Sequence, residues 1–92
     1  MTYDITEEGT KYMKSLIHRM RRSGREDVHL ALLRHIFNEC EMYGECRGED
    51  RWPFMSVLRE ELPGLSYREA EREVMNVLPA LEEAGYICEL RR

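Results

Sequence analysis

Near the end of the chain, side chains that can recognise nucleic acid recur four residues apart. Arg68, Arg72 and Asn76 would lie on one face of a helix, because residues four apart are neighbours on a helix surface. An arginine can donate two hydrogen bonds to guanine or to a phosphate, and an asparagine can pair with adenine. Ser66 and Tyr67 begin the same helix, where free backbone amides favour anions, so we expect both to contact phosphates.

The same helix face also has a simpler interpretation. Glu69 and Glu73 flank the three side chains, and carboxylates repel phosphates. Opposite charges three or four residues apart are typical of a helix face that meets only water. The sequence therefore supports two interpretations, a nucleic-acid surface and a solvated or protein-facing surface.

A second group of cations lies near the N-terminus. The net charge of the 92-residue chain is −4, yet residues 9–25 contain six Lys or Arg and no acid. At helical spacing, the following side chains would form one basic ridge: Lys11, Lys14, His18, Arg21 and Arg25. Such a ridge could follow phosphates, or it could be a solvated face with cations at the end of a helix. The lack of acids favours the first, because a solvated face usually mixes both signs.

The other reactive residue types form no recognisable catalytic or metal-binding set. His18, His29 and His35 have no Ser, Cys or carboxylate at a catalytic spacing, so we expect no enzymatic activity. Cys40 and Cys46 are separated by five residues, whereas the cysteines of a zinc pair usually stand two to four apart. We therefore expect buried or idle thiols, with no metal and no cofactor.

Helices must position these side chains, and the spacing of apolar residues predicts four of them. Caps and turn residues give the expected ranges as 7–23, 28–43, 52–62 and 67–84. The residues 44–51 are polar and indicate a loop. Pro79 removes a backbone hydrogen bond, so we expect a kink or break near Leu78. No repeat or long linker divides the sequence, which predicts a single domain, residues 1–92, with one core.

The segment LSYREAEREVMNVLPALEEAGYICEL, residues 65–90, resembles winged helix-turn-helix transcription regulators of the MarR and PadR type. In these proteins the recognition helix ends in a pattern that Leu81-Glu82-Glu83-Ala84-Gly85-Tyr86-Ile87 matches. The helix is about one turn longer here than is usual, and Pro79 is not typical. The resemblance implies a mostly α fold with a small β wing: four helices plus a two-stranded antiparallel sheet.

A second resemblance lies at the N-terminus. Tyr3-Asp4-Ile5-Thr6-Glu7-Glu8-Gly9 looks like the returning wing strand and the helix start that follow the first wing strand in such regulators. A circularly permuted wing would fit this order, with residues 2–5 antiparallel to 86–91, either within one chain or between two. The first helix would then correspond to the terminal dimerisation helix of the family.

The resemblance and the cationic residues together imply a DNA-binding transcriptional regulator, with helix 66–84 as its recognition helix. Its partners would be double-stranded DNA and a second copy in a homodimer. Arg91 and Arg92, past the final strand, would contact the minor groove or the backbone. The polar, acidic N-terminus is unlike a signal peptide and no apolar run could span a membrane, so we expect a cytoplasmic protein. The alternative is a winged-helix protein–protein interaction module without DNA binding.

Overall fold

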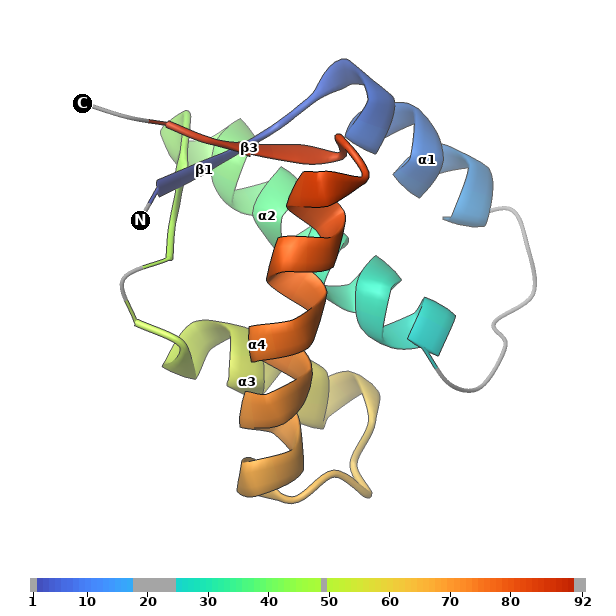
Figure 1. The fold of residues 1–92 in the computed structure, drawn as a ribbon, viewed down its shortest axis with the longest axis vertical. Coiled ribbons are helices and arrows are strands. Elements are labelled where there is room, and N and C mark those ends of the chain that lie inside the picture. Colours follow the sequence, from blue (N-terminus) through green and yellow to red (C-terminus); the bar gives the residue numbers. More distant parts are fainter. Residues whose placement is uncertain (1, 18–24, 49, 91–92) are drawn as a thin grey trace.

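The computed structural model describes residues 2–17, 25–48 and 50–90. In chain order the elements are β1 (Thr2–Ile5), α1 (Glu7–Ile17), α2 (Arg25–Tyr43), β2 (Cys46–Arg47), α3 (Trp52–Glu61), α4 (Tyr67–Glu83) and β3 (Ile87–Glu89). Figure 1 shows α4 crossing in front of α2, with α3 below, α1 to the right and the strands across the top. The four predicted helices are therefore present, in a fold that is mostly helical with a small antiparallel sheet.

The sheet has three strands, in the order β2-β1-β3. The expected antiparallel pairing of the two terminal strands is confirmed within one chain, with Asp4 opposite Cys88. The expectation of only two strands is wrong, because β2 lies in the segment predicted as a loop and pairs Cys46 with Tyr3. Gly44, at φ 80°, turns the chain out of α2 so that Cys46 is buried. A strand of two residues is too short to produce an alternating pattern in the sequence.

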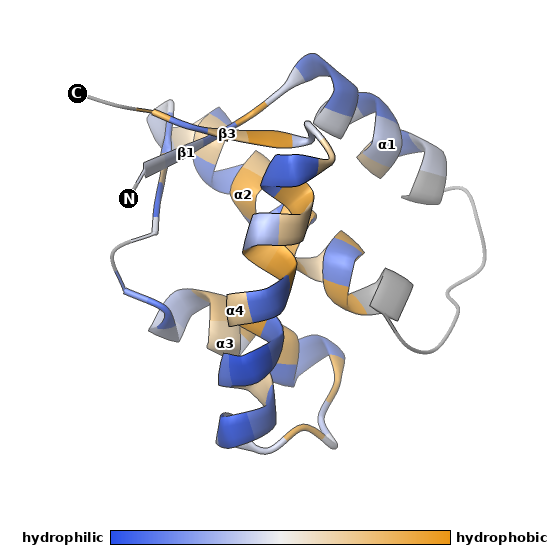
Figure 2. Cartoon of the chain, viewed as in Figure 1, coloured by the Kyte–Doolittle hydropathy of each residue, from blue (hydrophilic) through white to orange (hydrophobic). Residues whose placement is uncertain are grey.

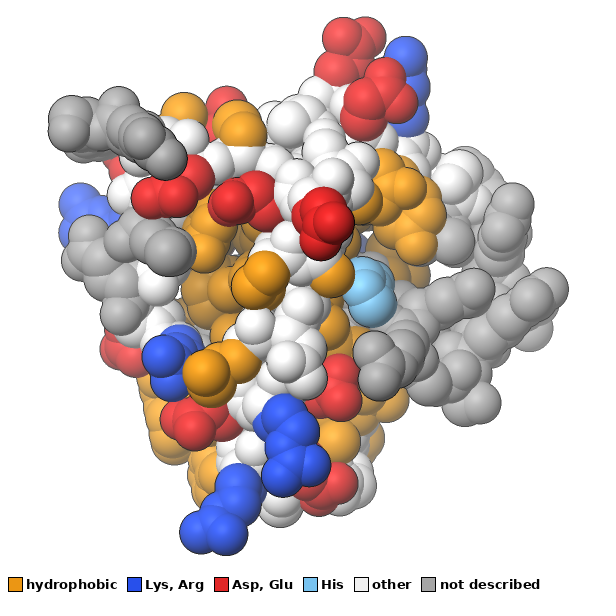
Figure 3. All heavy atoms as spheres, in the orientation of Figure 1, with side chains coloured by type: hydrophobic (Ala, Val, Ile, Leu, Met, Phe, Trp, Pro, Cys, Tyr) orange, Lys and Arg blue, Asp and Glu red, His pale blue; other side chains and the backbone are white. Residues whose placement is uncertain are grey.

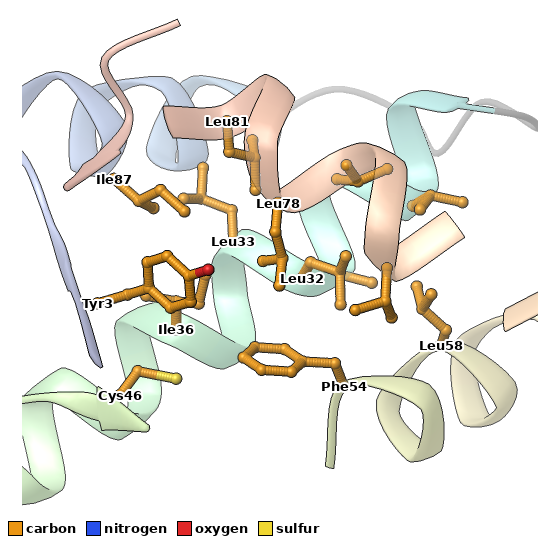
Figure 4. Packing of buried hydrophobic residues seen from close by; sticks show 14 of the residues in the cluster. Tyr3, Leu32, Leu33, Ile36, Cys46, Phe54, Leu58, Leu78, Leu81 and Ile87 are labelled. Atoms are coloured by element: carbon orange, nitrogen blue, oxygen red, sulfur yellow. The ribbon is translucent and has the colours of Figure 1, made fainter. Parts of the chain in front are cut away.

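The centre of the core is α2, which packs against the other three helices and against β1 and β2. Its Leu32, Leu33 and Ile36 are fully buried, and together they form an apolar face broad enough to contact more than one neighbouring element. Around them lie buried side chains from the other elements, among them Tyr3, Phe54, Leu58, Leu78, Leu81 and Ile87 (Figure 4). The core thus holds α3, α4 and the sheet in fixed relative positions.

The first helix is attached to the turn between α4 and β3. Thr6 caps α1, as predicted, by accepting a hydrogen bond from the Gly9 amide at 3.0 Å, and its hydroxyl donates to the Gly85 carbonyl. The Thr6 amide donates to the Tyr86 carbonyl at 3.0 Å. The rings of Tyr12 and Tyr86 stack at 4.3 Å between centroids. These contacts bring α1 against the C-terminal end of α4.

The helix α4 continues without a break through Pro79, so the break considered near Leu78 does not occur. Pro79 is exposed, whereas Val77, Leu78 and Leu81 on either side of it are buried. Core packing on both sides therefore holds the helix together where one backbone hydrogen bond is lost. Figure 2 shows hydrophilic residues over the N-terminal half of α4, on the face turned away from α2.

Candidate nucleic-acid interface

The start of α4 is closed by a reciprocal pair of hydrogen bonds. The Ser66 hydroxyl accepts from the Glu69 amide at 3.1 Å, and the Ser66 amide donates to Glu69 Oε1 at 3.1 Å. These bonds, first the one from the Ser66 backbone and then the one from its side chain, lower the pKa of Glu69 below its ordinary value. A carboxylate therefore already lies at the helix start, where the sequence predicted that Ser66 would meet a phosphate.

The predicted reading face of α4 lies on the outside of the molecule. Arg68, Arg72 and Asn76 are all exposed, on the side opposite the buried stripe of this helix. Neither arginine has a hydrogen bond or ion pair with any residue that the structure describes. Two exposed acids lie between them in the sequence: Glu71 lies 3.9 Å from the guanidinium of Arg51, and the charge of Arg72 helps to lower the pKa of Glu69. Neither guanidinium is held in an ion pair with a described residue, so both can donate to a ligand from solvent.

The basic ridge predicted for the first helix is not one continuous row. Lys11 lies between two acids of its own helix, 3.9 Å from Glu7 and 3.8 Å from Glu8. Lys14 is exposed and has no ion pair with a described residue. Arg25 begins α2, so its predicted place on the face of the first helix is wrong. Four further residues of the predicted interface or ridge lie outside the described residues: His18, Arg21, Arg91 and Arg92.

Charges of both signs lie along the face of α4 seen in Figure 3. Basic and acidic side chains are mixed over its N-terminal half, in the lower part of the view, where Glu69 and Glu71 are exposed, whereas acids predominate over its C-terminal half and the sheet. Glu82 and Glu83, in the last turn, are both exposed. In the described part of the chain, the positive surface of α4 does not join the lysines of α1 in one basic face.

Sequence reasoning missed a cluster at the corner between α3 and α4. The Tyr67 ring stacks on Trp52, with 5.3 Å between centroids and 13° between planes, and the Arg59 guanidinium carbon lies 3.7 Å from the centre of the Tyr67 ring. Arg59 Nε also donates to the Leu65 carbonyl at 3.2 Å. Trp52 stands directly before Pro53, where a tryptophan either anchors the loop into the core or, if exposed, indicates a partner site. It is 54% exposed, which favours the partner site.

Burial governs the chemistry of His35, Cys40 and Cys46, whereas Cys88 is exposed. Burial lowers the pKa of His35, whose ring meets the Phe54 ring edge-on at 5.2 Å. Burial raises the pKa of Cys40 to about 11 and that of Cys46 to about 12, so both thiols stay protonated at neutral pH. Within residues 2–17, 25–48 and 50–90, no three His, Cys, Asp or Glu side chains come together as metal ligands. The same residues contain no helix that is long and apolar enough to cross a membrane.

No family model, no curated protein and no solved structure matches this chain. The resemblance to winged-helix regulators therefore remains a prediction from the sequence.

Proposed function

We propose that this chain is a winged-helix DNA-binding transcriptional regulator, with α4 as its recognition helix. The main support is the exposed face that carries Arg68, Arg72 and Asn76. Neither arginine has a hydrogen bond or an ion pair with a described residue, although Arg72 is near enough to Glu69 to help lower its pKa, so both can donate to guanine or phosphate without first breaking an ion pair. Asn76 supplies an amide that suits adenine.

The order of the elements also supports this assignment. The helices α3 and α4 are joined by a turn at Pro63 and Gly64, and in a helix-turn-helix the second helix of such a pair reads the major groove. The strand β3 follows α4 and pairs with β1, as a permuted wing requires. A permuted winged helix therefore accounts for a chain in which β1 and α1 come first and β3 comes last.

In this mode DNA meets the N-terminal half of α4. A recognition helix usually contacts base edges with its N-terminal residues, and here that half carries the arginines. The exposed Glu82 and Glu83 would be kept away from phosphates by the same orientation. Tyr67 adds its hydroxyl to the backbone contact, while its ring stays in the stack with Trp52.

The remaining predicted contacts belong to the periphery of this interface. Lys14 is the exposed cation of α1 that no described acid neutralises, and Arg21, Arg91 and Arg92 complete the predicted set. A homodimer would place two copies of α4 about 34–36 Å apart, facing successive major grooves. The molecular mass in solution, measured with and without duplex DNA, tests this part of the proposal.

The central test is binding of a labelled random-sequence duplex over a series of salt concentrations. We expect the affinity to fall steeply as salt rises. The double variant Arg68→Ala, Arg72→Ala should bind at least about tenfold more weakly, and its salt slope should be smaller by about two if both arginines contact phosphates. Arg47→Ala is the matched control, because Arg47 is an exposed arginine on β2.

Three results would contradict the assignment. The first is the absence of duplex binding at low salt. The second is a double variant that binds as well as the unaltered chain, and the third is an Arg47→Ala variant that loses as much affinity as the double variant. In each case α4 is not the DNA-reading helix.

A further inference from the structure

A shallow groove runs along α3 at its corner with α4. Its volume is about 420 Å³, within the range of about 300–1,000 Å³ that is usual for ligand sites. The lining residues are Trp52, Ser56, Arg59, Glu60, Pro63 and Tyr67. Ser56, Arg59 and Glu60 follow Trp52 by four, seven and eight residues, so these four side chains share one face of α3. The groove is therefore a surface presented by one helix face and closed on one side by Tyr67.

The aromatic rings in this groove are ordered but open to solvent. Trp52 is 54% exposed although its ring is stacked on the Tyr67 ring, so about half of this residue is open to solvent. Tyr67 is itself 52% exposed. Arg59 is held over the Tyr67 ring and by the Leu65 carbonyl, which leaves its terminal N–H groups free to donate. A ligand would thus meet flat apolar surface beside fixed hydrogen-bond donors.

The charges of the groove select the class of ligand. Among the described residues that line the groove, only Arg59 and Glu60 are charged, so these two charges cancel and do not favour a polyphosphate. Glu60 is exposed and has no hydrogen bond or ion pair with a described residue, so its carboxylate can accept a cation. Exposed aromatic surface with carbonyl-binding donors and one carboxylate suits a proline-rich segment that carries a basic residue.

We propose that this groove binds a polyproline II segment of a partner protein, with a proline on Trp52 and a Lys or Arg beside Glu60. Glu60 stands eight residues after Trp52, which corresponds to about 12 Å along α3. A polyproline II helix rises about 3.1 Å per residue, so the basic residue stands about four positions from the proline. This binding site goes beyond the proposed DNA contact and does not depend on Arg68 or Arg72.

Trp52 is the only tryptophan of the chain, so its fluorescence reports on the groove. The probes are a capped octapeptide of seven prolines and a C-terminal Arg, the same peptide ending in Glu, a Gly-Ser octapeptide and single-stranded octathymidylate. We expect the Arg peptide to shift the emission to shorter wavelength and to reach saturation. The Glu peptide should bind about two- to fivefold more weakly, and Glu60→Gln should remove that difference. The Gly-Ser peptide should give no shift.

Tyr67→Ala should weaken the Arg peptide at least about tenfold, because the stack that orders Trp52 is lost. Tyr43→Ala is the matched control, since Tyr43 is 69% exposed and lies outside the groove. Circular dichroism verifies that both variants fold. The proposal is overturned if the Arg peptide gives no saturable shift at millimolar concentration, or if octathymidylate binds more tightly than the peptide. It is also overturned if Tyr43→Ala weakens binding as much as Tyr67→Ala does.

The same samples separate this site from the DNA contact. The double variant Arg68→Ala, Arg72→Ala should retain peptide binding, and Glu60→Gln should not lower the affinity for duplex DNA. Loss of peptide binding in the double variant would overturn the assignment of the peptide to the α3 groove. Failure of duplex binding alone would remove the DNA proposal and leave the peptide site in place.

Discussion

Replacing Gly9 by alanine should detach α1 from the turn between α4 and β3. A Cβ atom at this position would lie 2.0 Å from the Tyr86 carbonyl oxygen, whereas ordinary contacts begin at 3.4 Å. The helix must therefore move outward by more than 1 Å. That movement separates Thr6 from the Gly85 and Tyr86 carbonyls and pulls the Tyr12 ring off the Tyr86 ring.

The size of the effect follows from these contacts. Two hydrogen bonds contribute about 0.5–1.5 kcal/mol each, and a stacked aromatic pair about 0.5–1.5 kcal/mol. Alanine in place of glycine within a helix returns up to about 1 kcal/mol. The Gly9→Ala variant should therefore lose about 2 kcal/mol of unfolding free energy, which lowers the melting temperature of a domain of this size by about 8–16 °C.

Urea unfolding followed by circular dichroism, with Trp52 fluorescence as a second probe, measures this loss. Gly64→Ala is the matched control, because a Cβ atom at Gly64 would meet nothing within 4 Å. The control should stay within about 0.5 kcal/mol of the unaltered chain. A Gly9→Ala variant as stable as the unaltered chain would refute the docking of α1 at Tyr86, and with it the position of the N-terminal segment.

Three further measurements test the described side chains. At pH 8 a maleimide should label the exposed Cys88 well before Cys40 and Cys46, whose pKa values burial raises to about 11 and about 12; equal rates for all three would contradict this. Burial lowers the pKa of His35 below 6.5, so its contribution to the free energy of unfolding is fully present above pH 6.5. That contribution is lost as the pH falls from 6.5, the pKa in the unfolded chain, towards the lower pKa in the folded chain. An NMR titration midpoint at or above 6.5 would exclude this. Glu69→Gln keeps a capping side chain but removes a negative charge beside Arg68 and Arg72. The affinity for duplex DNA at low salt should therefore rise by about two- to fivefold. An unchanged affinity would contradict the presence of phosphates near the start of α4.

The elements that the sequence predicted best are those with local signals. Ser66 begins the predicted fourth helix and is the N-cap of α4, although its capping box with Glu69 was not predicted. Gly85 ends α4 at φ 83°, a conformation that only glycine adopts without strain. Each of these signals lies within a few residues of the feature that it predicts, so no knowledge of the tertiary structure is needed.

Features that depend on distant partners could not be predicted in the same way. The strand β2 exists because Cys46 meets Tyr3, which is 43 residues earlier in the chain. The need for glycine at position 9 arises only where α1 meets Tyr86. A two-residue strand and a single glycine carry no periodic pattern, so only the folded chain identifies them.

In the candidate sites too, features with a local signal in the sequence could be predicted and features that depend on tertiary contacts could not. The exposure of Arg68 and Arg72 follows from the helical period of α4, and it is confirmed. Glu7 stands four residues before Lys11, so the sequence already indicated that these two side chains could form an ion pair. The acid-free stretch of residues 9–25 does not reveal this pair, because it begins after Glu7. The stack of Trp52 on Tyr67 joins the starts of two different helices, so no helical spacing within one segment could predict it.

The position of α1 limits what the two basic groups can do together. The helix α4 has 17 residues and is therefore about 25 Å long. Arg68 lies in its first turn, whereas Thr6 at the start of α1 contacts Gly85, just past its last turn. The exposed acids Glu82 and Glu83 lie at that far end, and their charges would repel a duplex that approached the lysines of α1 along the helix. A duplex read by the N-terminal half of α4 would therefore pass these acids before it reached the lysines of α1, which places Lys14 at the edge of the proposed DNA contact and not at its centre.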